Sequence, residues 1–530
     1  MNIINTNLIR KAVALAFLST IPFLTFAQKP NWQNLDLKTD TTFGISTEKA
    51  YNELLKGKKS KPVLVGVLDG GVDYNHEDLK SIMWTNKKEK AGNGKDDDKN
   101  GYIDDVHGWN FLGSAKGSVH HETLELTRLI KRDQAKFANV DASKIAAADL
   151  PAYQNYQKMK ADFDARLASA KTTLANIEGF KNVMDPMIKK IGKENPTAED
   201  FEKFQPADEK ETRLKGMMLM MLKEGTFKDF YEGQIVKGLE HYKSEVDYNL
   251  NLNYDPRPEL VGDNYANSNE RFYGIGDIQG PDASHGTHVS GIIAADRKNT
   301  LGIKGVADNV MIMGVRAVPD GDERDKDVAN SIRYAVDNGA KVLNMSFGKS
   351  YSWDKKVVDD AVKYAMSKDV LLIQAAGNDN KDIDVEKNFP SRKYESGETA
   401  GAYLVVGASG WVDDSTLKAS FSNYGKTAVD VFAPGVQIYS TVPGSKYEAF
   451  DGTSMASPVV AGLAALIRSY YPKFTALQVK DIIMKSVIKV NHPVDVDVNG
   501  QPKQIPFADL CISGGIVNAY EALKLAATYK

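Results

Sequence analysis

The chain has 530 residues, a formal net charge of −3 and a composition that is 42% hydrophobic and 26% charged. This length accommodates two or more domains, and the composition is that of a folded globular protein rather than a disordered one. The slightly negative charge argues against nucleic acid as a partner. Cys511 is the only cysteine, which excludes an intramolecular disulfide.

Residues 1–27 have the pattern of a secretory signal peptide. Arg10 and Lys11 precede an apolar run, Ala12–Phe26, and Ala27 is the expected cleavage point. The run is too short and wrongly flanked for a membrane span, and a buried core segment is the alternative interpretation. We therefore expect a protein exported to the periplasm or the extracellular space, without a stable membrane anchor. Residues 28–60 would form an N-terminal extension.

Short, continuous apolar runs predict strands that are buried on both faces of a parallel sheet. These runs are Pro62–Leu68, Val310–Val318, Val342–Met345, Val370–Ala375, Leu404–Val406 and Val429–Phe432. Helical patterns lie among them, at Val328–Asp337, Lys355–Met366 and Leu463–Tyr470. This alternation predicts an α/β domain, in residues 61–114 and 276–525, whose mostly parallel sheet has helices on both faces.

Residues 115–275 interrupt that pattern and are rich in Lys, Glu, Ala and Met. From Tyr156 to Ile177, apolar residues recur three or four positions apart, which is typical of a long helix packing on a partner. Pro186 is expected to end this helix, and Thr197-Ala-Glu-Asp200 to begin another. We predict an α-helical hairpin or small bundle inserted into the α/β domain.

Ser454 lies in Asp451-Gly-Thr-Ser-Met-Ala-Ser-Pro458, on a tight turn where a helical pattern begins. Pro458 is expected in the first turn, where its missing N–H costs no hydrogen bond. A serine nucleophile needs a base and a group that orients the base. His285 enters another helix, and Asp69 ends the first buried strand, at the edge where parallel sheets bind ligands. A helix cap, a satisfied histidine and a strand-end carboxylate are the structural alternatives, but the three together favour catalysis.

These motifs resemble those of the subtilisin-like serine proteases, and the resemblance covers residues 61–113 and 277–522. It rests on VLDGGVD around Asp69, HGTHVSGIIAA around His285, NMSFG at Asn344–Gly348, AAGN at Ala375–Asn378, FSNYG at Phe421–Gly425, DGTSMASPVVAGLAAL around Ser454 and the closing segment Gly514–Ala519. The resemblance implies a subtilisin-like fold and a serine endopeptidase that acts on proteins or peptides.

In this family His285 would act as general base, Asp69 would orient it, and Ser454 would be the nucleophile. The side chain of Asn378 and the backbone N–H of Ser454 would form the oxyanion hole. The resemblance also implies a primary side-chain pocket with small walls, lined by Ser346, Phe347, Gly348, Ala375, Ala376 and Gly377.

The segment Gly94–Asp105 resembles the opening of a calcium loop, although no helical pattern flanks it. Oxygen-bearing side chains stand at the alternate positions Asp96, Asp98 and Asn100, and Asp104 or Asp105 would complete the shell. A solvated turn is the alternative. The resemblance implies a second calcium site at Asp78, with Asn299 as a further ligand. Both sites would be structural.

The helical insertion separates Asp69 from His285 by 216 positions. It would cover the cleft, recruit protein substrates or contact a protein partner, and the sequence leaves these three roles open. Two acidic segments, Asp320–Asp327 and Asp379–Glu386, suggest a preference for basic residues near the cleavage site, with solvated loops or calcium ligands as alternatives. The rival function is a scaffold that docks a partner through the insertion, but a scaffold has no physical need for an intact triad and Asn378.

Overall fold

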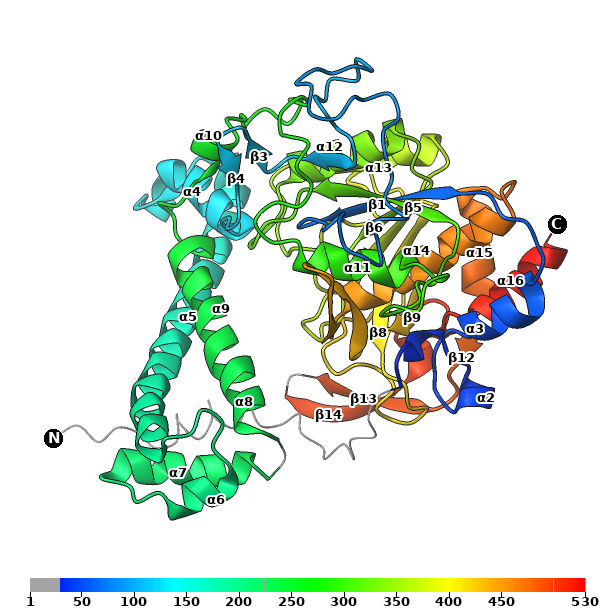
Figure 1. Cartoon of the computed structure of the whole chain (residues 1–530). Helices are drawn as coiled ribbons and strands as arrows, with labels where there is room; N and C mark the ends of the chain where they lie inside the picture. The colour runs from blue at the N-terminus through cyan, green and yellow to red at the C-terminus, as the bar shows by residue number, and fades with distance from the viewer. Residues whose placement is uncertain (1–28, 224, 499, 530) are drawn as a thin grey trace. The chain divides into compact units, whose positions relative to one another are not determined.

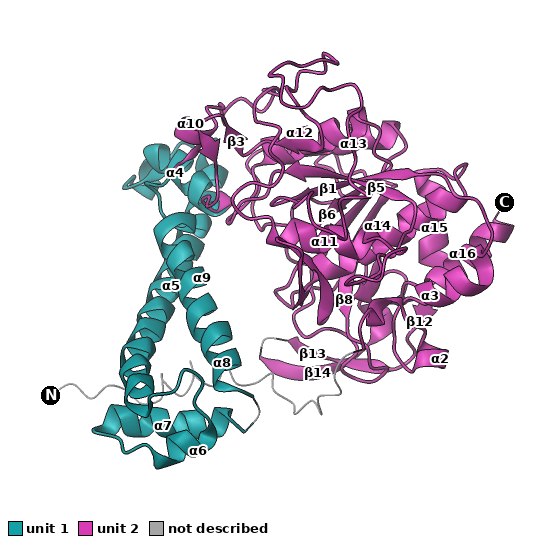
Figure 2. Ribbon diagram, viewed as in Figure 1, with its two compact units in different colours: residues 1–26, 126–254 teal, residues 27–125, 255–530 magenta. Residues whose placement is uncertain are grey.

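The computed structural model describes residues 29–223, 225–498 and 500–529. These residues form two compact units, which Figure 2 colours separately: residues 126–254, and residues 29–125 together with 255–529. The segment predicted to be a signal peptide lies outside the described residues. Within the described ranges, no helix is both long enough and apolar enough to cross a membrane.

The larger unit is built on a nine-stranded sheet with the order β12-β15-β9-β8-β7-β6-β1-β5-β2 (Figure 1). The strands are β1 (Val63–Asp69), β2 (Gly108–Asn110), β5 (Val310–Arg316), β6 (Val342–Met345), β7 (Leu371–Ala375), β8 (Tyr403–Ser409), β9 (Val431–Pro434), β12 (Ile488–Lys489) and β15 (Gly515–Ile516). Neighbouring strands run parallel, except that β12 is antiparallel to β15. The mostly parallel α/β fold predicted from the apolar runs is confirmed.

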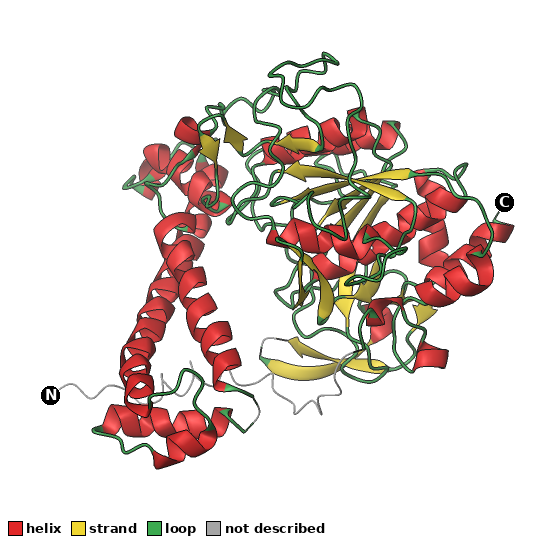
Figure 3. Ribbon diagram, in the orientation of Figure 1, coloured by secondary structure: helices red, strands yellow, loops and turns green. Residues whose placement is uncertain are grey.

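Helices cover both faces of this sheet, as Figure 3 shows. In β1, Val65 and Val67 join the hydrophobic core that contains α11 (Ser284–Ala294) and α14 (Thr453–Tyr470). Leu64 and Leu68 of the same strand join the opposite core, which contains α12 (Asp325–Asp337) and α13 (Lys355–Ser367). Because successive side chains of a strand point to opposite faces, a strand buried on both sides needs the continuous apolar sequence found here.

Smaller elements complete the larger unit. They are α2 (Leu37–Asp40), α3 (Thr47–Ala50), α10 (Arg257–Leu260), α15 (Ala476–Lys485), α16 (Ala519–Thr528) and the hairpins β3 (Gly113–Ser114) with β4 (Gly117–Ser118), β10 (Ile438–Val442) with β11 (Lys446–Phe450), and β13 (Pro493–Val498) with β14 (Gln501–Pro506). The N-terminal extension packs into this unit. The Trp32 indole donates to the Val436 carbonyl, and the Ala519 N–H donates to the Ile45 carbonyl.

The smaller unit is helical. Its elements are α4 (Glu125–Phe137, which begins one residue before the unit), α5 (Leu150–Ile191), α6 (Ala198–Lys203), α7 (Glu209–Met221), α8 (Phe227–Phe230) and α9 (Lys237–Ser244). The predicted helix start at Thr197 is confirmed, since Thr197 and Asp200 form a capping box. The predicted end at Pro186 is wrong, because α5 continues to Ile191. Met184 and Met187, on either side of the proline, are fully buried, and this burial offsets the lost backbone hydrogen bond.

Candidate active site

Asp69 and His285 form a hydrogen-bonded pair at the carboxyl edge of the sheet. Asp69 is the buried last residue of β1, and its Oδ1 accepts from His285 Nδ1 at 2.7 Å and from the Gly70 N–H at 2.8 Å. His285 is the second residue of α11, and its side chain is 43% exposed. Burial alone lowers the pKa of His285, but the negative charges of Asp69 and Asp282 raise it above its usual value.

Ser454 lies in the first turn of α14, next to Ser346. The Ser454 Oγ donates to the Ser346 carbonyl at 3.1 Å, and the Ser346 Oγ donates to the Ser454 carbonyl at 2.8 Å. No hydrogen bond between Ser454 and His285 occurs among the described residues. In this structure Asp69 is therefore hydrogen-bonded to His285, whereas the Ser454 hydroxyl is hydrogen-bonded to the Ser346 carbonyl.

Pro458 lies in the second turn of α14, so the expectation that it costs no hydrogen bond is wrong. In an α-helix, the N–H of residue 458 would donate to the carbonyl of Ser454. Proline has no N–H, and the Ser346 hydroxyl takes that place. Ser346 thus satisfies the carbonyl that Pro458 leaves unpaired and fixes the Ser454 backbone against the strand end after β6.

Asn378 is held through its side-chain oxygen, and its amide nitrogen has no acceptor among the described residues. Its Oδ1 accepts from both the N–H and the Oγ1 of Thr453, each at 2.9 Å. A Cβ added at Gly452, which has φ +156°, would lie 3.5 Å from Asn378 Nδ2 and 3.5 Å from the backbone N of Ser454. The two donors therefore border one space that glycine keeps open. The N-terminus of the 18-residue helix α14 adds a positive partial charge there.

Asn423 holds the loop that carries Asn378. Its Oδ1 accepts from the N–H groups of Asp379 at 3.1 Å and Lys381 at 2.8 Å, and its Nδ2 donates to the Ala376 carbonyl at 2.9 Å. Gly377 has φ +102°, and a Cβ there would lie 2.4 Å from Asn423 Nδ2. Asn423 lies in the FSNYG motif, but its sequence context does not reveal this role, because its partners lie more than 40 positions away.

The six residues predicted to line the primary pocket lie at the ends of two neighbouring strands, β6 and β7. Ser346, Phe347, Ala375 and Ala376 are buried there. Asn388 spans the two segments, since its Nδ2 donates to the Ala376 carbonyl at 3.1 Å and its Oδ1 would lie 2.8 Å from a Cβ at Gly348. Asn388 lies outside the motifs quoted above, so the sequence does not predict this contact.

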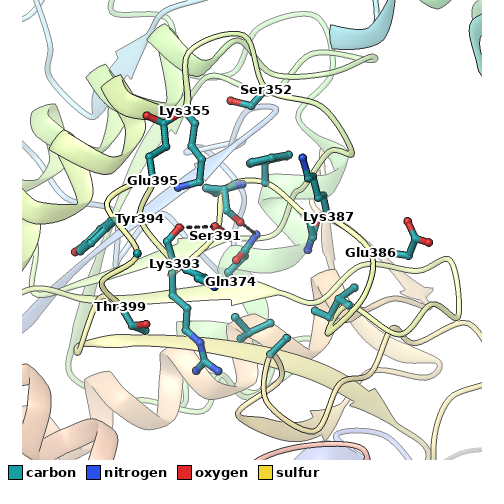
Figure 4. A pocket seen from close by; sticks show the side chains of 18 of the residues that line it. Ser352, Lys355, Gln374, Glu386, Lys387, Ser391, Lys393, Tyr394, Glu395 and Thr399 are labelled. Carbon is teal, nitrogen blue, oxygen red and sulfur yellow. Dashed lines mark hydrogen bonds between the residues drawn. The ribbon is translucent and has the colours of Figure 1, made fainter. Parts of the chain in front are cut away.

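A cavity of about 1020 Å³ adjoins these segments and includes Gln374 and Asn388 in its lining. Figure 4 shows charged side chains of both signs around it, from Lys355, Glu386, Lys387, Lys393 and Glu395. Such a lining favours water over an apolar ligand.

The acidic segment 320–327 is occupied by internal ion pairs. Asp327 accepts from the Arg257 guanidinium at 2.9 Å, and Asp325 lies 2.8 Å from the Lys349 ammonium. Both carboxylates are buried. These two carboxylates are therefore not free to select basic substrate residues, whereas the Asp320 side chain, which contacts His121, is 45% exposed.

The calcium-like loop brings together a partly different set of residues from the predicted one. Ligand oxygens of Glu89, Asp96 and Asp98 lie within 4.8 Å of one another. Glu89 is 9% exposed, and its Oε2 is buried without a hydrogen-bond partner among the described residues. Asn100 Oδ1 instead accepts the Tyr102 N–H, and Asp104 accepts the N–H groups of Asn93 and Gly94. Glu89 was missed because it lies outside the alternating motif.

Asp78 lies elsewhere and is buried next to Asn299. Its Oδ1 accepts from Asn299 Nδ2 at 2.7 Å, and its Oδ2 accepts from the Ile303 N–H at 3.4 Å. Burial raises the pKa of Asp78. Both carboxylate oxygens thus have donors within the protein.

The subtilase family model matches residues 60–505 of this chain, which is most of its length. The chain belongs to the subtilase family. Among curated proteins, it is 45% identical over 187 residues to a thermophilic serine proteinase of Bacillus sp. (strain AK1), covering 35% of this chain and 43% of the relative. It is 41% identical over 202 residues to subtilisin NAT of Bacillus subtilis subsp. natto, covering 38% and 49%.

This subtilase therefore spans about half the length of those two relatives. A subtilisin of Bacillus pumilus is 40% identical over 202 residues, which cover 38% of this chain and 68% of the relative. A solved structure of a protease from Pseudoalteromonas arctica is 28% identical and covers 47% of this chain and 78% of that one, with a TM-score of 0.38.

Proposed function

We propose that this subtilase is an exported serine endopeptidase that hydrolyses peptide bonds in proteins. The observation that carries the proposal is the 2.7 Å hydrogen bond between Asp69 and His285 at the sheet edge to which Ser454 also belongs. Three residues from distant parts of the sequence then have the types and the order of the family's triad. Support for the reaction class comes from the family and from relatives named as proteinases.

In the proposed reaction, substrate binding turns the Ser454 hydroxyl from the Ser346 carbonyl to His285 Nε2. The Oγ attacks the peptide carbonyl and its proton passes to His285, which then delivers it to the leaving amine. Asp69 keeps the imidazole oriented and stabilises its transient positive charge. Asn378 Nδ2 and the Ser454 N–H donate to the oxyanion. In the second half of the reaction, His285 takes a proton from water, which attacks the acyl-enzyme. The proton then passes from His285 to the Ser454 Oγ as the acid product leaves.

Fluorophosphonate labelling tests this proposal together with digestion of an unfolded protein. The purified chain should be labelled at Ser454 and should digest the substrate, while Ser454→Ala should do neither. If the folded wild-type chain is not labelled and cuts nothing in the presence of calcium, the proposal is wrong. Binding of a partner without labelling would favour the scaffold instead.

We also propose a structural calcium ion held by Glu89, Asp96 and Asp98. The donor set fits, because three carboxylates converge and the buried Glu89 Oε2 has no protein donor among the described residues. Hard oxygen ligands of this kind suit Ca²⁺. Bound calcium would offset most of the negative charge of the cluster and stabilise the folded state by about 2.7 kcal/mol at a concentration 100 times its dissociation constant.

A chelator titration followed by calorimetry tests the calcium site. Removing calcium should lower the Tm of the wild type, and Glu89→Gln should weaken calcium binding and reduce that Tm difference. Asp104→Asn is the matched control, since Asp104 accepts backbone N–H groups instead of joining the cluster. An equal loss of calcium binding in Asp104→Asn, or none in Glu89→Gln, would contradict this ligand set. The predicted site at Asp78 stays a proposal that Asp78→Asn tests in the same way.

Two further proposals concern location and the insertion. Cleavage after Ala27 would export the protein to the periplasm or beyond, which N-terminal sequencing of the mature protein checks. The helical insertion, predicted at residues 115–275, would dock a protein, either a substrate or a partner. Replacing residues 126–254 by a short linker should then reduce cleavage of folded proteins more than cleavage of short peptides. Equal effects on both would contradict a docking role.

A further inference from the structure

Arg316 is a buried cation at the end of β5, beside the proposed catalytic pair. It is 2% exposed, and it is the partner of Asp69 in the parallel register of β1 and β5. Burial lowers the pKa of Arg316 to about 10, and Asp277 and Asp282 partly oppose this effect. None of the described carboxylates forms an ion pair with it. Burying a guanidinium without a counter-ion costs desolvation free energy, which its hydrogen bonds to the protein must offset.

The guanidinium donates to three neutral acceptors on different segments. Nε donates to the Gly70 carbonyl at 2.7 Å, Nη1 to Asn110 Oδ1 at 3.2 Å and Nη2 to the Val119 carbonyl at 2.5 Å. Gly70 follows Asp69 directly. Asn110 and Val119 belong to the strand and loop that lead from β2 toward the helical unit. The planar guanidinium presents five donors in a fixed fork that spans these three acceptors, whereas a lysine ammonium presents its three donors from a single atom.

The loop that leads to His285 also contacts this side chain. Gly280 has φ +63°, and a Cβ there would lie 2.3 Å from Arg316 Nε. The same loop is joined to the chain after Asp69 by the hydrogen bond from the Val72 N–H to the Ile278 carbonyl. Arg316 thus lies between the segment that carries Asp69 and the segment that carries His285.

The entry segment of the insertion is joined to the chain after β5 as well. The Asp320 N–H donates to the His120 carbonyl at 2.9 Å, and the Glu122 N–H donates to the Asp320 carbonyl at 2.8 Å. His121 and Asp320 therefore form a parallel β-bridge. With the bond from Arg316 to Val119, the start of the insertion is built into the frame around the catalytic pair.

We propose that Arg316 is a positioning residue that sets the distance between Asp69 and His285 and ties both to the entry segment of the insertion. This inference rests on the proposed protease function. A misplacement of about 1 Å between catalytic groups lowers the rate by about 100-fold, so small shifts at Gly70 or Gly280 would be visible in kcat. Because Arg316 would act through Gly70 and Gly280 and not on the substrate, KM should hardly change.

The test compares kcat and KM of Arg316→Met and Arg316→Lys with the wild type on a short peptide, per labelled active site. We expect Arg316→Met to lose at least about tenfold in kcat with a KM within about twofold, and Arg316→Lys to recover part of that loss. Arg468→Met is the control. Arg468 is also buried and donates to the carbonyls of Lys341 and Asp369, so its loss should lower the Tm without changing kcat per site.

Wild-type kcat in Arg316→Met, or a loss equal to that of Arg468→Met, would overturn the inference. If Arg316→Met does not fold, Arg316→Lys decides, since it should still fold with a kcat below the wild type. A wild type that is never labelled would instead refute the proposed protease function. A double-mutant cycle with Asn110→Ala tests the link to the insertion: coupled effects on kcat support it, and additive effects contradict it.

Discussion

Removing the Asn423 side chain should damage both stability and catalysis. Asn423→Ala deletes three hydrogen bonds of a buried residue, two from the N–H groups of Asp379 and Lys381 and one to the Ala376 carbonyl. At about 1 kcal/mol each, the loss is about 3 kcal/mol of unfolding free energy. The same bonds fix the loop that holds Asn378. If that loop shifts by about 1 Å, kcat should fall by about 10- to 100-fold.

The assay combines thermal unfolding with kcat and KM on a short peptide. Asn338→Ala is the control, because the Asn338 side chain donates to the Tyr334 carbonyl at 3.1 Å, away from the site, and makes no other hydrogen bond to a described residue. It should lose about 1 kcal/mol and keep its kcat. An Asn423→Ala enzyme with the stability loss but with wild-type kcat would refute the reasoning, because the loop would then hold its position without Asn423.

Three more predictions follow from the site and its surroundings. Asp282→Asn should shift the acid limb of kcat/KM to lower pH, because His285 must be neutral to accept a proton and Asp282 raises its pKa; an unchanged limb contradicts this. Arg257→Met leaves the buried Asp327 without its guanidinium and should cost about 3–5 kcal/mol in thermal unfolding, so an unchanged Tm would be inconsistent with the pair. Asn378→Ala should lower kcat by about 10²–10³-fold with KM nearly unchanged, since this is the loss for the oxyanion asparagine of subtilisin. An effect confined to KM would exclude the proposed role.

Local patterns predicted the sheet well because burial on both faces demands a continuous apolar sequence. The run from Pro62 to Leu68 became β1, and the runs near Val342 and Val370 became β6 and β7. The helix start at Thr197 could also be predicted from the sequence, since a capping box is formed by residues three positions apart. Such signals depend only on neighbours in the chain.

The structural effects of two prolines could not be predicted from their neighbours in the sequence. Pro186 was expected to end α5, but the buried Met184 and Met187 hold the helix through it. Pro458 was expected to cost no hydrogen bond, but it cannot donate to the Ser454 carbonyl, and the Ser346 hydroxyl donates there instead. In both cases the compensation is a contact that only the folded chain reveals, namely the burial of the two methionines and the hydrogen bond from Ser346.

The sequence by itself determined the family, the α/β sheet and the residue types at the proposed catalytic positions, because short motifs of specific chemistry persist wherever the chain folds. Only the tertiary structure decided which groups meet. It paired Asp69 with His285 across 216 positions, placed Asn423 under the Asn378 loop, added Glu89 to the acidic cluster and put Arg316 between the proposed catalytic segments. Hydrogen bonds and charges act over a few ångströms in space, and distance along the chain does not record that separation.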